Sequence, residues 1–186
     1  MNFQAQNKTI QYCPTPKCGC TSTKIMIYKA LGGTISDEED IHLRFPTPTF
    51  TRRAAHIKFC IIRDPVERFL SAYSNKVVHH GIIPFVEFDD FIDNFQKYYN
   101  GHKGINHHFR PQVDFIGRFP NYHNRIFSLS QMPSVSEFLS EIIGKPVKLE
   151  KRQTGGNNRK PVPTKKQIDF IESLYKDDYR FFKEME

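Results

Sequence analysis

The sequence lacks the features that mark several large classes of protein. No hydrophobic run approaches the ~18 apolar residues of a membrane span, and residues 1–8 contain no hydrophobic core like that of a signal peptide. We therefore expect a soluble chain located in the cytoplasm. No internal repeat and no linker-like stretch interrupts the sequence, so we expect one domain over residues 1–186.

Cysteine is scarce as well. The four cysteines, Cys13, Cys18, Cys20 and Cys60, fall in the first third of the chain and include no Cys-x2-Cys pair. Free thiols in a reducing compartment are the expected state. Cys18, Cys20 and Cys60 with a histidine would supply ligand types that suit zinc, but their spacing is poor for such a site. We therefore do not expect a metal.

Positive charge and aromatic residues are abundant. The 186 residues carry a net charge of +7 and a sequence pI near 9.2, which indicates an anionic partner such as nucleic acid, a nucleotide, an acidic glycan or a membrane surface. The chain is 38% hydrophobic, with 17 Phe and 8 Tyr, and this is enough to fill one sizeable core. Charge alone does not choose among the anionic partners.

The hydrophobic pattern predicts strands that alternate with helices. Residues 11–13 and His56–Ile62 resemble buried strands, and two more short strands are predicted over 113–116 and 125–129. The order predicts an α/β fold, in which a mainly parallel central sheet is covered on both sides to give three α/β/α layers.

Helices are predicted where apolar residues recur with helical spacing. They are expected after Lys24 up to Gly32-Gly33, after Asp64 to Val77, and over residues 85–99, and a short helical turn is expected near 36–41. A Ser134–Glu137 capping box is expected to open another helix that Gly144 closes, and Thr164 with Gln167 to cap the last one. Glycine-rich, basic residues 101–112 and 151–163 are expected to be surface loops.

The segment Gln11–Lys24 organises the chain. An extended stretch leads through two prolines to Lys17, Gly19 and a row of hydroxyls, and a helix follows at once. A lysine and the unpaired N–H groups of a helix start together favour a phosphate. The usual Gly-x4-Gly-Lys-Ser/Thr spelling is absent. A plain strand-turn-helix with a hydroxyl N-cap is therefore the alternative.

Arg63 follows the second predicted strand, at the edge where open α/β sheets bind ligands. Its forked guanidinium suits a phosphate. The alternative is a salt bridge to Asp64 or Glu67, and Arg68 is expected to pair with a carboxylate on its own helix.

Three motifs stand in order along the chain: Tyr12–Thr21, Ile62–Ala72, and His108-Phe-Arg-Pro-Gln112. Together they resemble the Tyr-Cys-x-x-Pro-Lys-x-x-Cys-Thr loop, the Val-Arg-Asp-Pro-x-Glu-Arg-Leu-x-Ser-Ala turn and the His-Trp-Arg-Pro-Gln element of the carbohydrate sulfotransferases that include the chondroitin, dermatan and HNK-1 enzymes. Residues Glu172–Phe182 are similar to the family's closing helix.

The resemblance implies a P-loop-type sulfotransferase fold. It also implies transfer of a sulfuryl group from 3′-phosphoadenosine 5′-phosphosulfate to an acceptor hydroxyl, expected to belong to a carbohydrate, without a metal. Lys17 would stabilise the leaving phosphate, Arg63 and Ser71 would bind the 3′-phosphate, and His108 would be the base, with His107 as the alternative one residue away. The remaining implied nucleotide-binding residues lie in the first loop and the start of its helix: Cys18, Gly19, Cys20, Thr21, Ser22 and Thr23.

Several residues have two alternative roles within this interpretation. Lys24 would either help to bind the phosphate or be a solvated lysine, and Arg110 would either meet an anionic acceptor or stabilise its loop. Arg159 or Lys160 would close over the 3′-phosphate or belong to a disordered basic loop. The His79-His80 pair has no motif around it and is not assigned.

The sequence also departs from the family pattern. Phe109 stands where the family has tryptophan, and Gln112 runs directly into Val113 without the family's cysteine-bearing insertion.

Two other functions are alternatives. A small-molecule kinase would also start from a phosphate loop, but Arg63 stands where a magnesium-binding acid is expected. A basic nucleic-acid-binding module fits the charge and the 13% aromatic content, but no known motif supports it.

Overall fold

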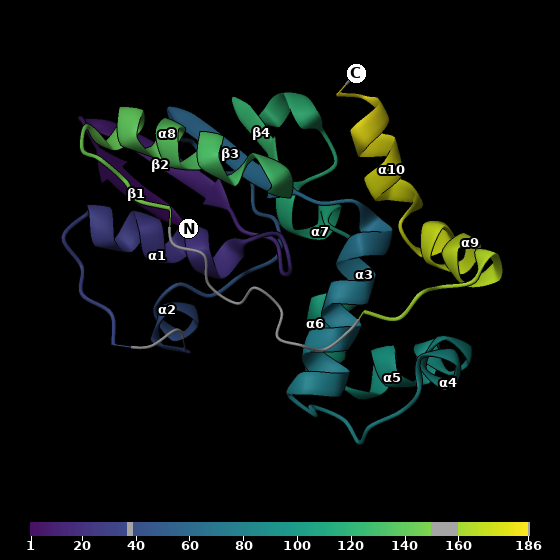
Figure 1. Ribbon diagram of the computed structural model, residues 1–186. Coiled ribbons are helices and arrows are strands. Elements are labelled where there is room, and N and C mark those ends of the chain that lie inside the picture. The colour runs from purple at the N-terminus through teal and green to yellow at the C-terminus, as the bar shows by residue number, and fades with distance from the viewer. Residues whose placement is uncertain (37–38, 150–159, 186) are drawn as a thin grey trace. The chain divides into compact units, whose positions relative to one another are not determined.

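The computed structural model describes residues 1–36, 39–149 and 160–185 (Figure 1). The chain divides into two compact units. The first comprises residues 1–62 and 112–152, and the second comprises residues 63–111 and 153–186. In the described part of the chain, no helix has the length and apolar character that crossing a membrane demands.

The first unit contains a four-stranded sheet with the order β1-β2-β3-β4. The strand β1 (Asn2–Ala5) pairs antiparallel with β2 (Lys8–Cys13). The turn between them has positive φ at both Gln6 (48°) and Asn7 (60°), as a type I′ hairpin turn requires. This first strand was not predicted, because the sequence offers no Asn-Gly or Asp-Gly pair at the turn.

The other pairings in the sheet are parallel. The strands β3 (Ile57–Ile62) and β4 (Arg125–Ser128) lie beside β2 and β3 in register, with Cys13 opposite Cys60 and Ile62 opposite Ser128. Parallel strands bring their carboxyl ends to the same edge. The prediction of a mainly parallel α/β sheet is therefore confirmed, including β3 and β4.

One alternating set of strand residues forms the core of the first unit with two helices. Helices α1 (Cys20–Ala30) and α8 (Met132–Ile143) contribute apolar residues to this cluster. Its strand members are Phe3, Ile10, Tyr12, Phe59, Ile61 and Phe127. The opposite set includes Gln11, whose side chain donates to the Thr51 carbonyl and accepts from the Tyr122 hydroxyl. A loop and the 3₁₀ turn η2 (Pro120–Tyr122) therefore contact that set.

Two local predictions for this unit are wrong. Residues Val113–Ile116 form a helical turn, α7, rather than a strand, because the amides of Phe115 and Ile116 bond back to the Gln112 carbonyl. The predicted capping box at Ser134 does not form. Helix α8 begins at Met132, and a capping box instead joins Ser128 and Gln131 around the 3₁₀ turn η3 (Leu129–Gln131).

Other local predictions for this unit hold. Gly144 ends α8 in the left-handed region, as predicted. The short helix near residue 40, α2, runs over Glu39–Arg44, and residues 37–38 of that prediction lie outside the described residues.

The second unit is helical in its described residues. Helix α3 (Pro65–Tyr73) starts at the N-cap Asp64, as predicted, and continues as a π-helical turn η1 (Ser74–His79). The other helices are α4 (Phe88–Asp93), α5 (Phe95–Gly101), α6 (Lys103–Phe109), α9 (Lys165–Leu174) and α10 (Lys176–Lys183). Phe69 lies at the centre of their aromatic core, with its ring 4.8 Å from that of Phe109.

The predicted helix over 85–99 is divided in two. Asn94 ends α4 and precedes α5, with φ −108° and ψ 18°. Its side-chain amide donates to the Asp90 carbonyl. Such local bonds from asparagine to the backbone compete with a continuous helix.

The predicted loop over residues 101–112 is wrong, since α6 occupies its centre. His102 caps this helix, with Nδ1 accepting from the amides of Gly104 and Ile105. Histidine is not a usual N-cap and glycine disfavours helices. The local sequence therefore did not predict this helix. The capping box of Thr164 and Gln167 that opens α9 is confirmed.

Candidate functional site

The loop after β2 is a tight turn that presents Lys17. The amide of Cys18 bonds to the Thr15 carbonyl at 3.2 Å, which closes a four-residue turn. Pro16 stands at its second position and Lys17, with φ 68°, at its third. Proline followed by a residue of positive φ is the pattern of a type II turn. The third position normally takes glycine or asparagine, so the lysine here is held in a strained backbone conformation.

Gly19 connects this turn to α1, and it also lies in the left-handed region, with φ 71°. A Cβ atom at this position would lie 3.1 Å from Cδ1 of Leu129 and 3.2 Å from Sδ of Met132. Both the backbone conformation and the close neighbours therefore call for glycine. With no side-chain cap on Gly19, the first amides of α1 lack the N-cap partner that a hydroxyl residue would have provided.

The hydroxyl residues of the first helical turn differ in their contacts. The Thr23 hydroxyl is buried and donates to the Gly19 carbonyl at 3.0 Å. The Thr21 hydroxyl lies 2.9 Å from Nε2 of His42. Lys24 is fully buried and donates to the Thr47 hydroxyl at 2.6 Å. The structure therefore excludes a solvated surface position for Lys24.

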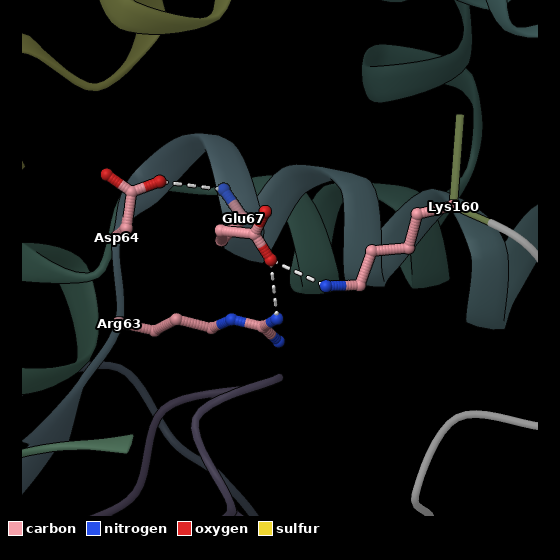
Figure 2. A network of polar contacts seen from close by, with 4 residues as sticks. All are labelled: Arg63, Asp64, Glu67 and Lys160. Carbon is pink, nitrogen blue, oxygen red and sulfur yellow. Dashed lines mark hydrogen bonds and ion pairs between the residues drawn. The ribbon is translucent and has the colours of Figure 1, made fainter. Parts of the chain in front are cut away.

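Arg63 follows β3 at the start of the second unit, where Figure 2 shows it beside Glu67. Its Nη2 donates to Oε2 of Glu67 at 3.1 Å, and Nζ of Lys160 donates to the same oxygen at 2.5 Å. Asp64 forms no part of this pair, because its Oδ1 caps α3 by accepting from the Glu67 amide at 2.8 Å. The hydrogen bond from Lys160 lowers the pKa of Glu67.

This arrangement keeps two cations side by side on one half-exposed carboxylate. Arg63 has 16% of its side-chain surface exposed and Lys160 has 43%. The salt bridge from Arg63 to Glu67 was the alternative that the sequence left open, and it is present. Guanidinium and ammonium donors that bond to one carboxylate oxygen are also suited to a phosphate oxygen. Arg159 lies outside the described residues, and Ser71 lies half-buried on α3.

His108 lies half-buried near the end of α6, and a backbone bond sets its tautomer. Its Nδ1 is 2.8 Å from the Gly104 carbonyl oxygen. A carbonyl only accepts, so Nδ1 must carry the proton, and the neutral ring then has its lone pair on Nε2. This is the form that a general base needs. His107 is adjacent, with its ring centroid 5.1 Å from that of His108.

The end of α6 that carries His108 is held by two buried side chains. Arg68 of α3 donates to the carbonyls of His108 (3.1 Å) and Arg110 (2.5 Å). The Tyr175 hydroxyl donates to the carbonyl between them, that of Phe109, at 2.7 Å. Three successive carbonyls at a helix end are thus satisfied from inside the unit.

The contacts of Arg68 correct the prediction that it pairs with a carboxylate of its own helix. It is 1% exposed and its guanidinium lies 5.0 Å from the centre of the Tyr175 ring. Arg110 donates to the side-chain oxygen of Asn106 on α6, which supports the structural alternative for that residue.

The comparisons with known proteins decide the family. A model of the sulfotransferase family matches residues 2–183, which is nearly the whole chain. The chain belongs to the sulfotransferase family. Carbohydrate sulfotransferase 10 of Xenopus laevis and that of Homo sapiens are each 32% identical to it over 94 residues. The match covers 42% of this chain and 26% of each relative, so the chain matches about a quarter of their length. No solved structure matches the chain.

Several residues around the sulfotransferase motifs escaped the sequence analysis. His42 and Thr47, which contact the start of α1, lie in a segment without clear periodicity. Tyr175 was covered only by the resemblance of Glu172–Phe182 to the family's closing helix. The hydroxyl of Tyr175 could have indicated this role, because a buried tyrosine usually makes a hydrogen bond.

A cavity of about 270 Å³ opens in the first unit beside the start of the sulfotransferase loop. It is lined by Cys13 and Pro14 from that loop, by Arg44 and Arg53, and by the aromatic rings of Phe45, Phe50 and Phe115. Guanidinium groups beside aromatic rings can bind anionic, ring-shaped ligands. None of these arginines or rings was predicted from the sequence to belong to the site.

The cysteines of the first unit are buried free thiols, as predicted. Burial raises the pKa of Cys13 to about 11 and raises that of Cys60 as well. These two thiols are therefore protonated near neutral pH, which is unfavourable for a nucleophile.

Proposed function

We propose that this sulfotransferase moves a sulfuryl group from 3′-phosphoadenosine 5′-phosphosulfate to a hydroxyl of a carbohydrate, within a P-loop-type sulfotransferase fold. The observation that carries the proposal is the loop after β2, where Lys17 occupies a left-handed turn position immediately before Gly19 and the start of α1. Strained backbone positions cluster at functional sites. The left-handed conformation of Lys17 therefore supports a role for its side chain in binding.

The proposed nucleotide contacts divide between two segments. The 5′-phosphosulfate end is assigned to Lys17, to the amides from Gly19 to Ser22 and to the Thr21 hydroxyl. Cys18 and Thr23 are not included, because the Cys18 amide donates to the Thr15 carbonyl and the amide and hydroxyl of Thr23 both donate to the Gly19 carbonyl. The 3′-phosphate is assigned to Arg63 and Ser71. The contacts of Arg63 and Lys160 with the same Glu67 oxygen support the assignment of Arg63, because a guanidinium that bonds to a carboxylate can also bond to a phosphate.

The proposed reaction is a displacement at sulfur. The acceptor oxygen forms a bond to sulfur as the bond from sulfur to the bridging 5′-phosphate oxygen breaks, and the products are a sulfate ester and adenosine 3′,5′-bisphosphate. Nε2 of His108 takes the hydroxyl proton, and the tautomer set by Gly104 supports that role. Lys17 stabilises the negative charge that grows on the departing phosphate. We propose that no metal is needed for these steps.

The test starts from ligand binding and turnover by the purified chain. Adenosine 3′,5′-bisphosphate should raise the thermal midpoint more than adenosine 5′-monophosphate does. The sulfate donor with a carbohydrate panel should release adenosine 3′,5′-bisphosphate, and a chelator should leave the rate unchanged. A chelator-sensitive reaction with ATP would instead favour a kinase. Tighter, salt-sensitive binding to oligonucleotides would favour a nucleic-acid-binding module.

Two substitutions test the nucleotide assignments. Lys17→Ala and Arg63→Ala should each weaken binding of adenosine 3′,5′-bisphosphate by about tenfold or more, as for the loss of a hydrogen bond between charged groups. Lys29→Ala and Arg180→Ala are matched controls, because both residues are exposed. Equal binding by the Lys17 and Arg63 variants and by their controls would contradict the assignments.

A further inference from the structure

Lys24 occupies an unusual position for a lysine. It lies on α1, one turn beyond Thr21, and its side chain is fully buried. Its ammonium donates to the Thr47 hydroxyl at 2.6 Å and lies 3.5 Å from Nδ1 of His42. Burial lowers its pKa. A buried ammonium costs folding free energy, so a role in binding would account for its presence.

The hydrogen bonds from Lys24 have a fixed direction. An ammonium has three donors and no acceptor, so Nδ1 of His42 accepts from it. The neutral imidazole then carries its proton on Nε2, which lies 2.9 Å from the Thr21 oxygen and donates to it. The Thr21 oxygen is thereby an acceptor in this bond, and its own proton is available for donation elsewhere.

We propose that Lys24 and His42 are positioning residues that keep the Thr21 hydroxyl as a hydrogen-bond donor toward an anion bound by the loop after β2. The inference rests on the proposed function, since the anion is the 5′-phosphate end of the nucleotide. Without Lys24, the other His42 tautomer would accept the Thr21 proton, and the hydroxyl would be lost as a donor. Hydrogen bonds in a chain polarise one another. The buried ammonium of Lys24 would therefore strengthen the bond from Thr21 to the anion.

A packing role predicts different behaviour from the same contacts. The network joins α2 and residue 47 to α1, so it also holds the loop after α2 in place. If that were its whole purpose, replacing His42 would lower stability, and its effect on binding would not depend on whether Thr21 has a hydroxyl.

The experiment is a double-mutant cycle read by calorimetric binding of adenosine 3′,5′-bisphosphate. Thr21→Val and His42→Phe should each weaken binding by about tenfold, as for one hydrogen bond to a charged group. The double variant should be no weaker than the single ones. Glutamine can accept from Lys24 and donate to Thr21 at once, so His42→Gln should stay within about threefold of the unchanged protein, as should Thr21→Ser.

The outcomes separate this inference from the function. Failure of the unchanged protein to bind the nucleotide would remove the proposed function itself. Normal binding by His42→Phe, or additive losses near a hundredfold in the double variant, would overturn the positioning role alone. If His42→Phe does not fold, His42→Asn replaces it. The shorter amide cannot span both partners and should lose about tenfold, and binding equal to that of His42→Gln would equally overturn the role.

Discussion

The Cys18 thiol donates a hydrogen bond to Oε1 of Gln112 at 3.3 Å, with both side chains fully buried. The two residues are 94 positions apart. One belongs to the loop after β2 and the other ends the His108–Gln112 motif. Gln112 therefore supports the loop next to Lys17. The His108–Gln112 motif thus has a structural role in addition to the proposed role of His108 as a base.

Gln112→Ala should destabilise the fold by about 1–3 kcal/mol, because it removes the partner of a buried donor and opens a small cavity. Cys18→Ser keeps a donor of similar size and should cost less. Urea unfolding followed by circular dichroism measures both. Gln4→Ala, at an exposed site on β1, is the control. A Gln112→Ala protein as stable as that control would refute the supporting role.

Lys17→Gly should uncouple stability from function. Glycine adopts the positive φ of 68° at this position without strain, so the variant should be more stable than Lys17→Ala by about 1 kcal/mol. Both variants lack the ammonium and should bind adenosine 3′,5′-bisphosphate equally weakly. Thermal unfolding and calorimetry test the two halves. Equal midpoints for Gly and Ala would show that the turn is not strained.

His108→Ala should lower kcat by about 10²–10⁴-fold, as expected for loss of a general base, with little change in nucleotide affinity. His107→Ala is the matched control and should retain most of the rate. Steady-state kinetics with the sulfate donor distinguishes the two. A rate loss confined to the His107 variant would move the base by one residue and leave the family assignment intact.

Arg68→Lys should not be a conservative change. A lysine cannot reproduce the forked donation to the carbonyls of His108 and Arg110, so we expect a loss of about 2–3 kcal/mol in stability. Since α6 would lose part of its support, kcat should fall more than nucleotide affinity does. Tyr175→Phe removes one bond, to Phe109, and should cost about 1 kcal/mol. Unchanged stability in both variants would refute the support of α6.

His123 should contribute a pH dependence to stability. Its Nε2 donates to the Ile116 carbonyl at 2.8 Å, and burial lowers its pKa from 6.5. Below pH 6.5 the unfolded chain takes up a proton that the folded chain does not, so stability falls as the pH decreases toward the folded pKa. His123→Gln keeps a donor without titrating. Unfolding free energies at several pH values should differ in slope between the two proteins, and parallel curves would contradict the prediction.

The local pattern of the sequence determined much of the framework. The apolar run of β3, the Asp64-Pro65 start of α3 and the Thr164 capping box each depend on neighbouring residues, and all three are present. The same holds for the loop before α1, where Pro16, Lys17, Cys18 and Gly19 follow one another. Three motifs in order were enough to predict the sulfotransferase family, which the comparison over residues 2–183 confirms.

Only the tertiary structure decided which partners the polar side chains have. Arg68 meets the carbonyls 40 and 42 residues away, and Lys24 meets Thr47 at a separation of 23. Each side chain offers donors that suit many acceptors, so sequence spacing cannot select among them. Burial selects instead, because a charge removed from water must bond to whichever groups the packed helices bring within reach.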